Sequence, residues 1–134
     1  MSAPVGPYSP AVRAADWVVT SGQLGLAPGA DGAPVLVDGG TGPQLRRALA
    51  NVAAVLAAEG ADLVDVVKAT VFLVDMDDFA LMNEIWVELL PAPRPTRSAV
   101  GVAALPLGAR VEVEVWAYAP VPAGSPPAVG SAGD

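Results

Sequence analysis

Residues 109–118 read ARVEVEVWAY, a regular alternation that is typical of a β-strand with one buried face. The apolar side of this strand consists of Val111, Val113, Val115 and Ala117. The opposite side consists of Glu112, Glu114, Trp116 and Tyr118. The valine side requires a covering layer, for which helices are suited, whereas the opposite side mixes charge with aromatic surface.

Two segments with apolar residues at helical spacing can supply that layer. The first begins where Thr41 and Gln44 fit a capping box, and Pro43 suits an early helical position. Gly60 is expected to end this helix. One face of the segment is apolar, so we expect that face to pack against the valine side of the sheet.

The second helical segment follows Asp75 or Asp77, either of which can cap it, and ends before Pro91. Its apolar stripe consists of Phe79, Met82, Trp86, Leu89 and Leu90. Asn83 lies four residues after Phe79 and therefore faces nearly the same way as the stripe. This amide is either a satisfied buried group or a ligand contact.

Strand patterns flank and separate the two helices. They predict strands over residues 17–23, 66–74, 98–103 and 111–118, with residues 11–16 as a hairpin partner for the first. Segment 25–42, rich in Gly, Asp and Pro, predicts a loop with at most one short strand, at 35–37. The element order indicates an α+β sheet whose two helices cover one face, so we expect the second face to pack against another copy of the chain.

Composition excludes several classes of chemistry. The 134 residues contain 14 Asp and Glu against 7 Lys and Arg, a net charge of −7, so nucleic acid is not expected as a partner. The absence of histidine and cysteine excludes zinc sites built from these residues, thiol nucleophiles, disulfides and Ser-His-Asp triads. Catalysis must then use Arg, Glu, Asp, Tyr, Ser, Asn or backbone groups.

The chain reads as one domain over residues 1–119, followed by a Pro/Gly/Ala-rich segment, 120–134, that we expect to be a flexible tail. No run of about 18 apolar residues predicts a membrane span. The first ten residues show neither a basic nor an apolar region of a secretory signal, so a cytoplasmic location is expected.

Residues 96–103 read TRSAVGVA, and Arg97 stands where the pattern predicts an apolar residue. The residues on its side of the strand are Arg97, Ala99, Gly101 and Ala103. The small residues leave room for a compact anion. One interpretation of Arg97 is a structural ion pair with Glu112 or Glu114, and the other is a two-pronged contact with a ligand carboxylate, for which arginine is better suited than lysine.

The remaining polar candidates are weak when taken singly. Glu112 and Glu114 share one strand face, which is usually a solvated pair of charges. If packing buries one of them near Arg97, desolvation and the arginine act on its protonation in opposite directions, and the glutamate can orient a water molecule. Tyr8 and Ser21 alone are typical of core and turn positions.

Five stretches taken together strongly resemble the YjgF/RidA family, also called endoribonuclease L-PSP. They read GPYSPAV, TSGQ, NVAAVLAAEG, DVVKATVFLVDMDDFALMN and RPTRSAVGVAALPLGARVEVEVWA, and the resemblance covers about residues 6–119. It implies a chorismate-mutase-like α+β fold of the bacillus type, with a mixed sheet, assembled as a homotrimer with its sheets around a central barrel. Three active sites are then expected at the clefts between subunits.

The resemblance also implies a reaction. Members that keep the arginine hydrolyse reactive enamines and imines such as 2-aminoacrylate to 2-keto acids and ammonia, without a cofactor or metal. By position, Arg97 resembles the residue that grips the substrate carboxylate, and Glu112 the one that holds the attacking water. The pocket positions are Tyr8, Ser21, Gly22, Asn83, Ser98 and Ala99.

The chain also departs from the family pattern. Ala99 replaces a common cysteine that is not regarded as the nucleophile, so activity is expected to remain. Arg94 replaces an aromatic residue, Trp86 replaces a tyrosine, and the connection over residues 87–96 is a few residues short. These changes bear on substrate size and charge, and Arg94 would suit a substrate with a second carboxylate.

Two other functions stay open: a non-catalytic regulatory trimer that binds small carboxylates, and a hydrolase or isomerase specific to one pathway. RNA cleavage is disfavoured, because the acidic balance and the missing histidine provide neither phosphate affinity nor the usual acid-base pair.

Overall fold

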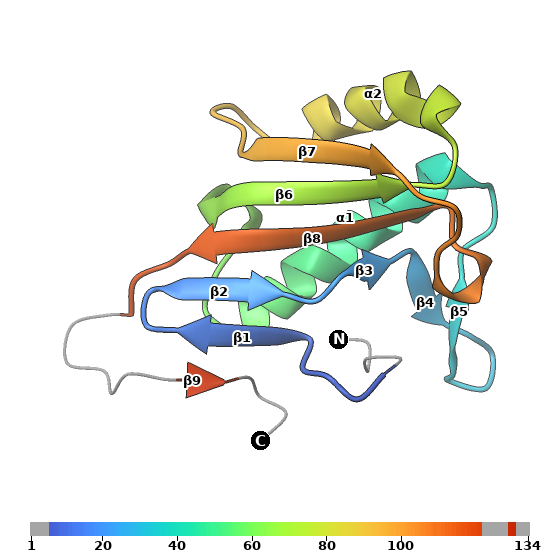
Figure 1. Cartoon of the computed structure of the whole chain (residues 1–134). Coiled ribbons are helices and arrows are strands. Elements are labelled where there is room, and N and C mark those ends of the chain that lie inside the picture. The colour runs from blue at the N-terminus through green and yellow to red at the C-terminus, as the bar shows by residue number, and fades with distance from the viewer. Residues whose placement is uncertain (1–5, 122–128, 131–134) are drawn as a thin grey trace.

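The computed structural model describes residues 6–121 and 129–130, and most of its strands join in one mixed sheet (Figure 1). The strands of this sheet are β1 (Ala11–Ala14), β2 (Trp17–Thr20), β3 (Gln23–Leu24), β6 (Val66–Leu73), β7 (Thr96–Gly101), β8 (Val111–Tyr118) and β9 (Val129–Gly130). Their order is β7-β6-β8-β2-β1-β9, and β3 also pairs with β8. β6 and β7 run parallel, and the other pairs are antiparallel.

Two α-helices pack on one side of this sheet, α1 (Thr41–Ala58) and α2 (Phe79–Leu89). Figure 1 shows α1 behind the sheet and α2 beside its β7 edge. Three short 3-10 helices lie in the connections: η1 (Leu63–Asp65), η2 (Met76–Asp78) and η3 (Pro106–Gly108). The α+β class, the mixed sheet and the two helices agree with the prediction.

The valine side of β8 lies in the core, as its alternation predicts. Its members are at most 2% exposed: Val111, Val113, Val115 and Ala117. They share one apolar cluster with the α1 residues Leu45, Leu49, Val52 and Leu56. Each large side chain buried in this way contributes about 1.5–3 kcal/mol, so this layer is the main stabilising contact of the fold.

A buried arginine holds the C-terminal end of α1. Gly60 has a φ of 77° and ends the helix in the left-handed conformation, as predicted. Arg13, only 6% exposed, donates hydrogen bonds to backbone oxygens just beyond α1 and at the ends of two strands. These acceptors are Ala15 at 3.1 Å, Glu59 at 2.5 Å and Ala119 at 2.8 Å. A cation at this position also complements the helix dipole.

The start of α1 differs from the prediction. Its N-cap is Gly40, and no side chain caps the helix, so the capping box is wrong. Thr41 Oγ1 instead donates to Asp78 Oδ2 at 2.5 Å. Gln44 Oε1 accepts a hydrogen bond from the backbone N–H of Arg110 at 2.9 Å. Both side chains therefore bond to segments far along the chain rather than to their own helix.

The second helix is entered through a 3-10 turn. Asp75 Oδ1 accepts from the backbone N–H of Asp77 at 2.9 Å and caps η2, which runs directly into α2. The N-cap of α2 itself is Asp78, which makes no side-chain capping bond. The predicted capping by Asp75 thus applies to the turn that precedes the helix.

Most predicted strands are confirmed, with three differences. The predicted strand 17–23 is interrupted at Ser21 and Gly22, since β2 ends at Thr20 and β3 begins at Gln23. β1 and β2 form the predicted hairpin, and β8 has the predicted bounds. β7 begins at Thr96 and ends at Gly101, because it pairs with β6 over that range. Segment 25–42 contains two strands rather than at most one, since β4 (Leu26–Pro28) and β5 (Pro34–Leu36) form an antiparallel pair.

The side of the sheet opposite the helices carries exposed apolar groups. Trp17 contacts the rings of Trp116 and Tyr118 edge-on, with centroids 6.4 and 5.2 Å apart. These three rings remain 37–49% exposed, and Val12 and Val100 are each 40% exposed. We call this the open face of the sheet.

The predicted tail, residues 120–134, lies mainly outside the described residues, and its flexibility stays a prediction. Of its C-terminal part, the structure describes Val129–Gly130, which pairs with β1. In the part of the chain that is described, no helix has both the length and the apolar character needed to cross a membrane.

Candidate active site

Arg97 lies near the start of β7 and points toward α2. Its register partner on β6 is Ala69, which is buried in the core and pairs in turn with Val115 of β8. Residues in register across a sheet share a face, so Arg97 lies on the helix side. Arg97 therefore does not share a face of the sheet with Glu112 or Glu114.

Three residues of α2 surround the guanidinium of Arg97. Its Nη2 donates a hydrogen bond to Asn83 Oδ1 at 2.8 Å. Its Cζ lies 5.7 Å from the ring centroid of Phe79 and 5.2 Å from that of Trp86. Both distances are within the range of cation–π attraction.

The Arg97 guanidinium has unused hydrogen-bonding capacity. Apart from the bond to Asn83, its N–H groups have no hydrogen-bond partner among residues 6–121 and 129–130. No carboxylate in these ranges forms a salt bridge with Arg97. Partial burial lowers the pKa of the Arg97 guanidinium, because desolvation disfavours the charged form. Arginine nevertheless stays charged at neutral pH, so the site holds a partly desolvated cation that no carboxylate of the described residues neutralises.

The alternative of a structural ion pair is not realised. Glu112 pairs in register with Phe72 of β6, and Glu114 with Thr70, so both acids project from the open face. From strand geometry, the backbones of Arg97 and Glu112 are about 14 Å apart in one chain. Their side chains also leave opposite sides of the sheet.

Of the small residues that follow Arg97 on β7, Gly101 is covered by another side chain. Ala99 is half-buried and packs against the core. A side chain at Gly101 would lie 3.0 Å from Met76 Cγ, so Met76 occupies the space over this glycine. The predicted room for an anion is therefore restricted to the part near Arg97 and Ala99.

Ser98 is separated from Arg97 by the sheet. Its Oγ accepts a hydrogen bond from Lys68 Nζ at 2.8 Å, and its register partner Thr70 also pairs with Glu114. Ser98 therefore belongs to the open face. Within one chain it does not join the group around Arg97.

Glu112 is in direct contact with Gly22. A Cβ atom added to Gly22 would lie 2.6 Å from Glu112 Cδ and 2.9 Å from Oε1. Real Cβ atoms do not approach so closely, so the missing side chain creates the space that the carboxylate fills. Gly22 immediately precedes β3, whose Leu24 pairs with Glu112.

The carboxyl group of Glu112 is electrostatically perturbed. Burial raises its pKa above the usual glutamate range, and repulsion from the nearby Glu114 carboxylate raises it further. A carboxyl group with a raised pKa can exchange protons closer to neutral pH than an ordinary glutamate. This property suits a group that handles protons during hydrolysis.

Ser21 fastens the N-terminal segment beside this glutamate. Its Oγ donates to the Ser9 carbonyl at 2.6 Å, and its N–H donates to the Pro10 carbonyl at 2.8 Å. Ser21 is adjacent to Gly22 in the chain, so both bonds hold residues 9–10 near Glu112. Tyr8 precedes them and is 46% exposed. Tyr8 is therefore not a core residue.

Apart from Ser98, the predicted site residues thus form two groups in one chain. The arginine group lies under α2 and consists of Arg97, Asn83 and Ala99, with Phe79 and Trp86 around them. The glutamate group lies at the junction of β2, β3 and β8 and consists of Glu112, Gly22 and Ser21, with Tyr8 nearby. The sequence predicts these members, but it does not predict their division between opposite faces.

The sequence assigns Phe79 and Trp86 to the apolar stripe of the helix, and the resemblance links Trp86 to substrate size, but their contacts with Arg97 are not predicted. The available signal was their spacing. Asn83 lies four residues after Phe79 and three before Trp86, so all three project from one side of the helix.

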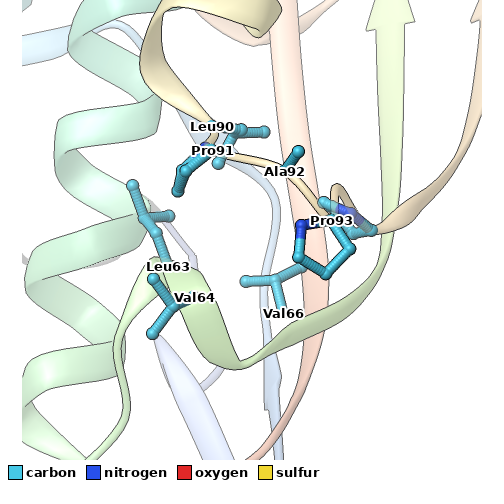
Figure 2. Close-up of a pocket in the computed structure, with 8 residues that line it drawn as sticks. Leu63, Val64, Val66, Leu90, Pro91, Ala92 and Pro93 are labelled. Carbon is cyan, nitrogen blue, oxygen red and sulfur yellow. The ribbon is translucent and has the colours of Figure 1, made fainter.

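A separate apolar cavity lies at the other end of α2 (Figure 2). Its volume is about 90 Å³, and its lining consists of Leu63, Val64, Val66, Leu90, Pro91, Ala92, Pro93 and Pro95. None of the predicted site residues lines it. Arg94, in the same loop, donates to the Val87 carbonyl at 3.3 Å and so closes the C-terminal end of α2.

Acidic side chains do not gather into a metal centre in the described ranges, where no group of three or more suitable ligands occurs. The chemistry that the site offers from its own residues therefore consists of a cationic anchor, an amide and a carboxylate.

These features define an α+β domain that has an arginine without a carboxylate partner in the described residues and a glutamate with a raised pKa. The chain belongs to the endoribonuclease L-PSP family, the YjgF/RidA family, whose profile matches residues 1–119. It is 44% identical over 115 residues to the 2-iminobutanoate/2-iminopropanoate deaminase of Bos taurus, covering 86% of this chain and 82% of that protein.

Solved structures show the same fold. The crystal structure of RidA from an Antarctic Psychrobacter species has a TM-score of 0.82 at 44% identity, covering 87% of this chain and 92% of that chain. The structure of E. coli TdcF with bound serine has a TM-score of 0.76 at 37% identity, covering 87% and 91%. The predicted family is thereby confirmed.

Proposed function

We propose that this protein hydrolyses reactive enamines and imines of the 2-aminoacrylate type to 2-keto acids and ammonia. The observation that carries the proposal is the Arg97 guanidinium, which is partly desolvated, fixed by Asn83 and without a carboxylate partner in the described residues. A short carboxylate substrate supplies the missing anion. Two parallel N–H···O bonds would hold it in a fixed orientation.

The reaction then needs a water molecule and proton transfer. An enamine such as 2-aminoacrylate first becomes the 2-imine, as its terminal carbon gains a proton and its nitrogen loses one. Water adds to the C=N carbon while the Glu112 carboxylate accepts a proton from it and passes that proton to the nitrogen, which gives a carbinolamine. The carboxylate then takes the hydroxyl proton as the C=O bond forms, and the C–N bond breaks as this proton goes to the nitrogen, which leaves as ammonia. One water is consumed for each ammonia released, and no electrons are exchanged. Glu112 is suited to this role because its raised pKa lies nearer to neutral pH.

Arg97 and Glu112 of one chain cannot act on one small substrate, since they project from opposite faces of the sheet. The complete site therefore takes Arg97, Asn83 and Ala99 from one protomer and Glu112, Gly22 and Ser21 from its neighbour. The apolar surface on the open face supports this assembly, because Trp116 and Tyr118 are 49% and 44% exposed in the single chain.

The proposed assembly is a homotrimer of the chorismate-mutase type, with the sheets around a central barrel. In a three-fold ring, one surface of each copy packs against a different surface of the next copy, so three equivalent sites result. In this assembly we place Tyr8 and Ser98 at the edge of the pocket. Because the side chain of Ser98 lies on the open face, it can contribute only to a site that this face forms with a neighbouring protomer.

The relatives support the same chemistry. Proteins of cattle, mouse and human that are 42–44% identical to this chain are named 2-iminobutanoate/2-iminopropanoate deaminase. The bound serine of TdcF carries a carboxylate next to an amine, the pattern expected in the substrate. RNA is not a fitting substrate for a chain with a net charge of −7. A cytoplasmic location stays a prediction, since relatives include a mitochondrial and a chloroplastic protein.

The test supplies freshly generated 2-aminoacrylate and imines of several amino acids and measures the release of keto acid. We expect the protein to accelerate this release over buffer. Hydrolysis at the uncatalysed rate for every imine would refute the enzymatic function, and binding of 2-keto acids without turnover would favour a regulatory trimer instead.

A further inference from the structure

The two aromatic rings beside Arg97 have a role that the proposed hydrolysis does not assign. Phe79, Asn83 and Trp86 project from the same side of α2, on successive helical turns. The amide of Asn83 accepts one N–H of the guanidinium, and a ring lies within 6 Å of it on either side of this amide along the helix. The cation is thus held by three contacts from one rigid element.

We propose that Phe79 and Trp86 are positioning residues that form an aromatic clamp on Arg97 and hold its guanidinium ready for the substrate carboxylate. This inference rests on the proposed function. The rings attract the cation through their quadrupoles, and the amide attracts it through its dipole. None of the three neutralises its charge, so the clamp fixes Arg97 while leaving its full charge for the ligand.

A carboxylate at either ring position would have the opposite effect. It would form an ion pair with Arg97 and compete with the substrate for the same N–H groups. Arg110 provides the contrast within this chain, since its guanidinium lies 3.5 Å from Asp78 and 3.7 Å from Asp75. Arg110 is therefore held by anions, whereas Arg97 is held by neutral groups.

The two rings differ in accessibility, and this difference makes the clamp testable. Trp86 is 4% exposed and belongs to the core, so its replacement carries a cost in stability. Phe79 is 39% exposed, so leucine at this position removes the ring with little effect on folding. Leu81, also 39% exposed on α2, does not contact Arg97 and is the matched control.

The experiment uses the full-length protein and the variants Phe79→Leu, Phe79→Tyr, Trp86→Leu, Trp86→Phe and Leu81→Ala. Steady-state kinetics with 2-aminoacrylate and calorimetric binding of pyruvate measure the effect on the anchor. We expect Phe79→Leu to raise KM and the pyruvate Kd about threefold, and Trp86→Leu about tenfold, with little change in kcat. Phe79→Tyr and Trp86→Phe, which retain a ring, should recover most of the affinity.

A second readout does not depend on activity. The Nε–H resonance of Arg97, assigned by its loss in Arg97→Lys, should move on removal of either ring and stay nearly in place in the ring-retaining variants. A merely structural role would lower the melting temperature without moving this resonance or KM. Unchanged KM, Kd and resonance in folded Phe79→Leu and Trp86→Leu would overturn the clamp. A wild-type protein that hydrolyses no imine would instead refute the proposed function, while the resonance still decides the clamp.

Discussion

Gly22 and Glu112 touch so closely that a Cβ atom on the glycine would lie 2.6 Å from the carboxyl carbon of the glutamate. The carboxylate therefore has its position only because residue 22 lacks a side chain. The contact joins the turn before β3 to the middle of the sheet. It also gives a direct way to move the proposed water-holding group without altering its chemistry.

The variant Gly22→Ala should fold but lose activity. The added methyl group displaces the Glu112 carboxylate, and we expect kcat to fall by about tenfold to a hundredfold, since proton transfer by a positioned group contributes about 10²–10⁴. Gly42→Ala is the control, because its Cβ would meet its nearest neighbour at an ordinary 3.6 Å. Steady-state kinetics measure the activity of both variants, and thermal unfolding shows whether they fold. Equal activity of Gly22→Ala and Gly42→Ala would contradict the claim that Gly22 fixes the position of the Glu112 carboxylate.

The raised pKa of Glu112 predicts opposite effects of pH on activity and stability. Activity should rise with pH as Glu112 ionises, with a midpoint above the ordinary glutamate pKa of about 4.3, because the carboxylate is the form that accepts a proton. The folded state retains this proton to higher pH than the unfolded state. The stability contribution of Glu112 therefore falls as pH rises from the unfolded pKa through the raised folded pKa.

Glu112→Gln should abolish activity and remove that part of the pH dependence of stability. Its melting temperature at neutral pH should equal or exceed that of the wild type, since a desolvated charge has been removed. Glu114→Gln removes the second cause of the shift and should move the acid limb of the activity profile to lower pH. A limb that stays in place would show that Glu114 does not act on Glu112.

Arg97→Lys should fold normally and lose about one to two orders of magnitude in kcat/KM, because an ammonium cannot reproduce the two-pronged contact. Its stability should change little, since Arg97 has no carboxylate partner in the described residues. Arg46→Lys, at a surface pair with Glu88, is a control expected to affect neither property. Strong destabilisation with retained activity would restore a structural role for Arg97.

Arg13→Met should destabilise the fold by about 3 kcal/mol, because it leaves three backbone oxygens without their donor. Arg13 lies at the far end of α1 from α2 and contacts none of the proposed site residues. Activity per folded molecule should therefore be unchanged at low temperature. Chemical denaturation measures the loss of stability, and a midpoint equal to that of the wild type would contradict the importance of these bonds.

The sequence predicts the secondary structure well where one side of an element is buried. The two-residue period of β8 correctly assigns its valines to the core, because burial of that side selects the pattern. The capping box fails because Thr41 and Gln44 bond to Asp78 and Arg110, and such partners are distant in the sequence. The β4–β5 pair is missed because its Gly- and Pro-rich composition is that of a loop.

The resemblance to the family names candidate site residues, but the sequence does not show how they are arranged. On β7 the small residues Ala99 and Gly101 alternate with Ser98 and Val100, and neither set shows which side is buried. The register of Arg97 with Ala69 of β6 determines on which face of the sheet Arg97 lies, and this register is a tertiary contact. For the same reason the separation of Arg97 from Glu112 could not be read from their strands alone.

The most direct test of the composite site mixes two impaired variants, Arg97→Lys and Glu112→Gln. If each site takes Arg97 from one protomer and Glu112 from its neighbour, about one quarter of the sites in randomly assembled trimers carry both intact groups. We therefore predict that co-refolded mixtures recover about one quarter of the wild-type kcat/KM, although each variant refolded alone retains at most about one tenth. A mixture no more active than its parents, with exchange of protomers verified by mass spectrometry, would contradict the account.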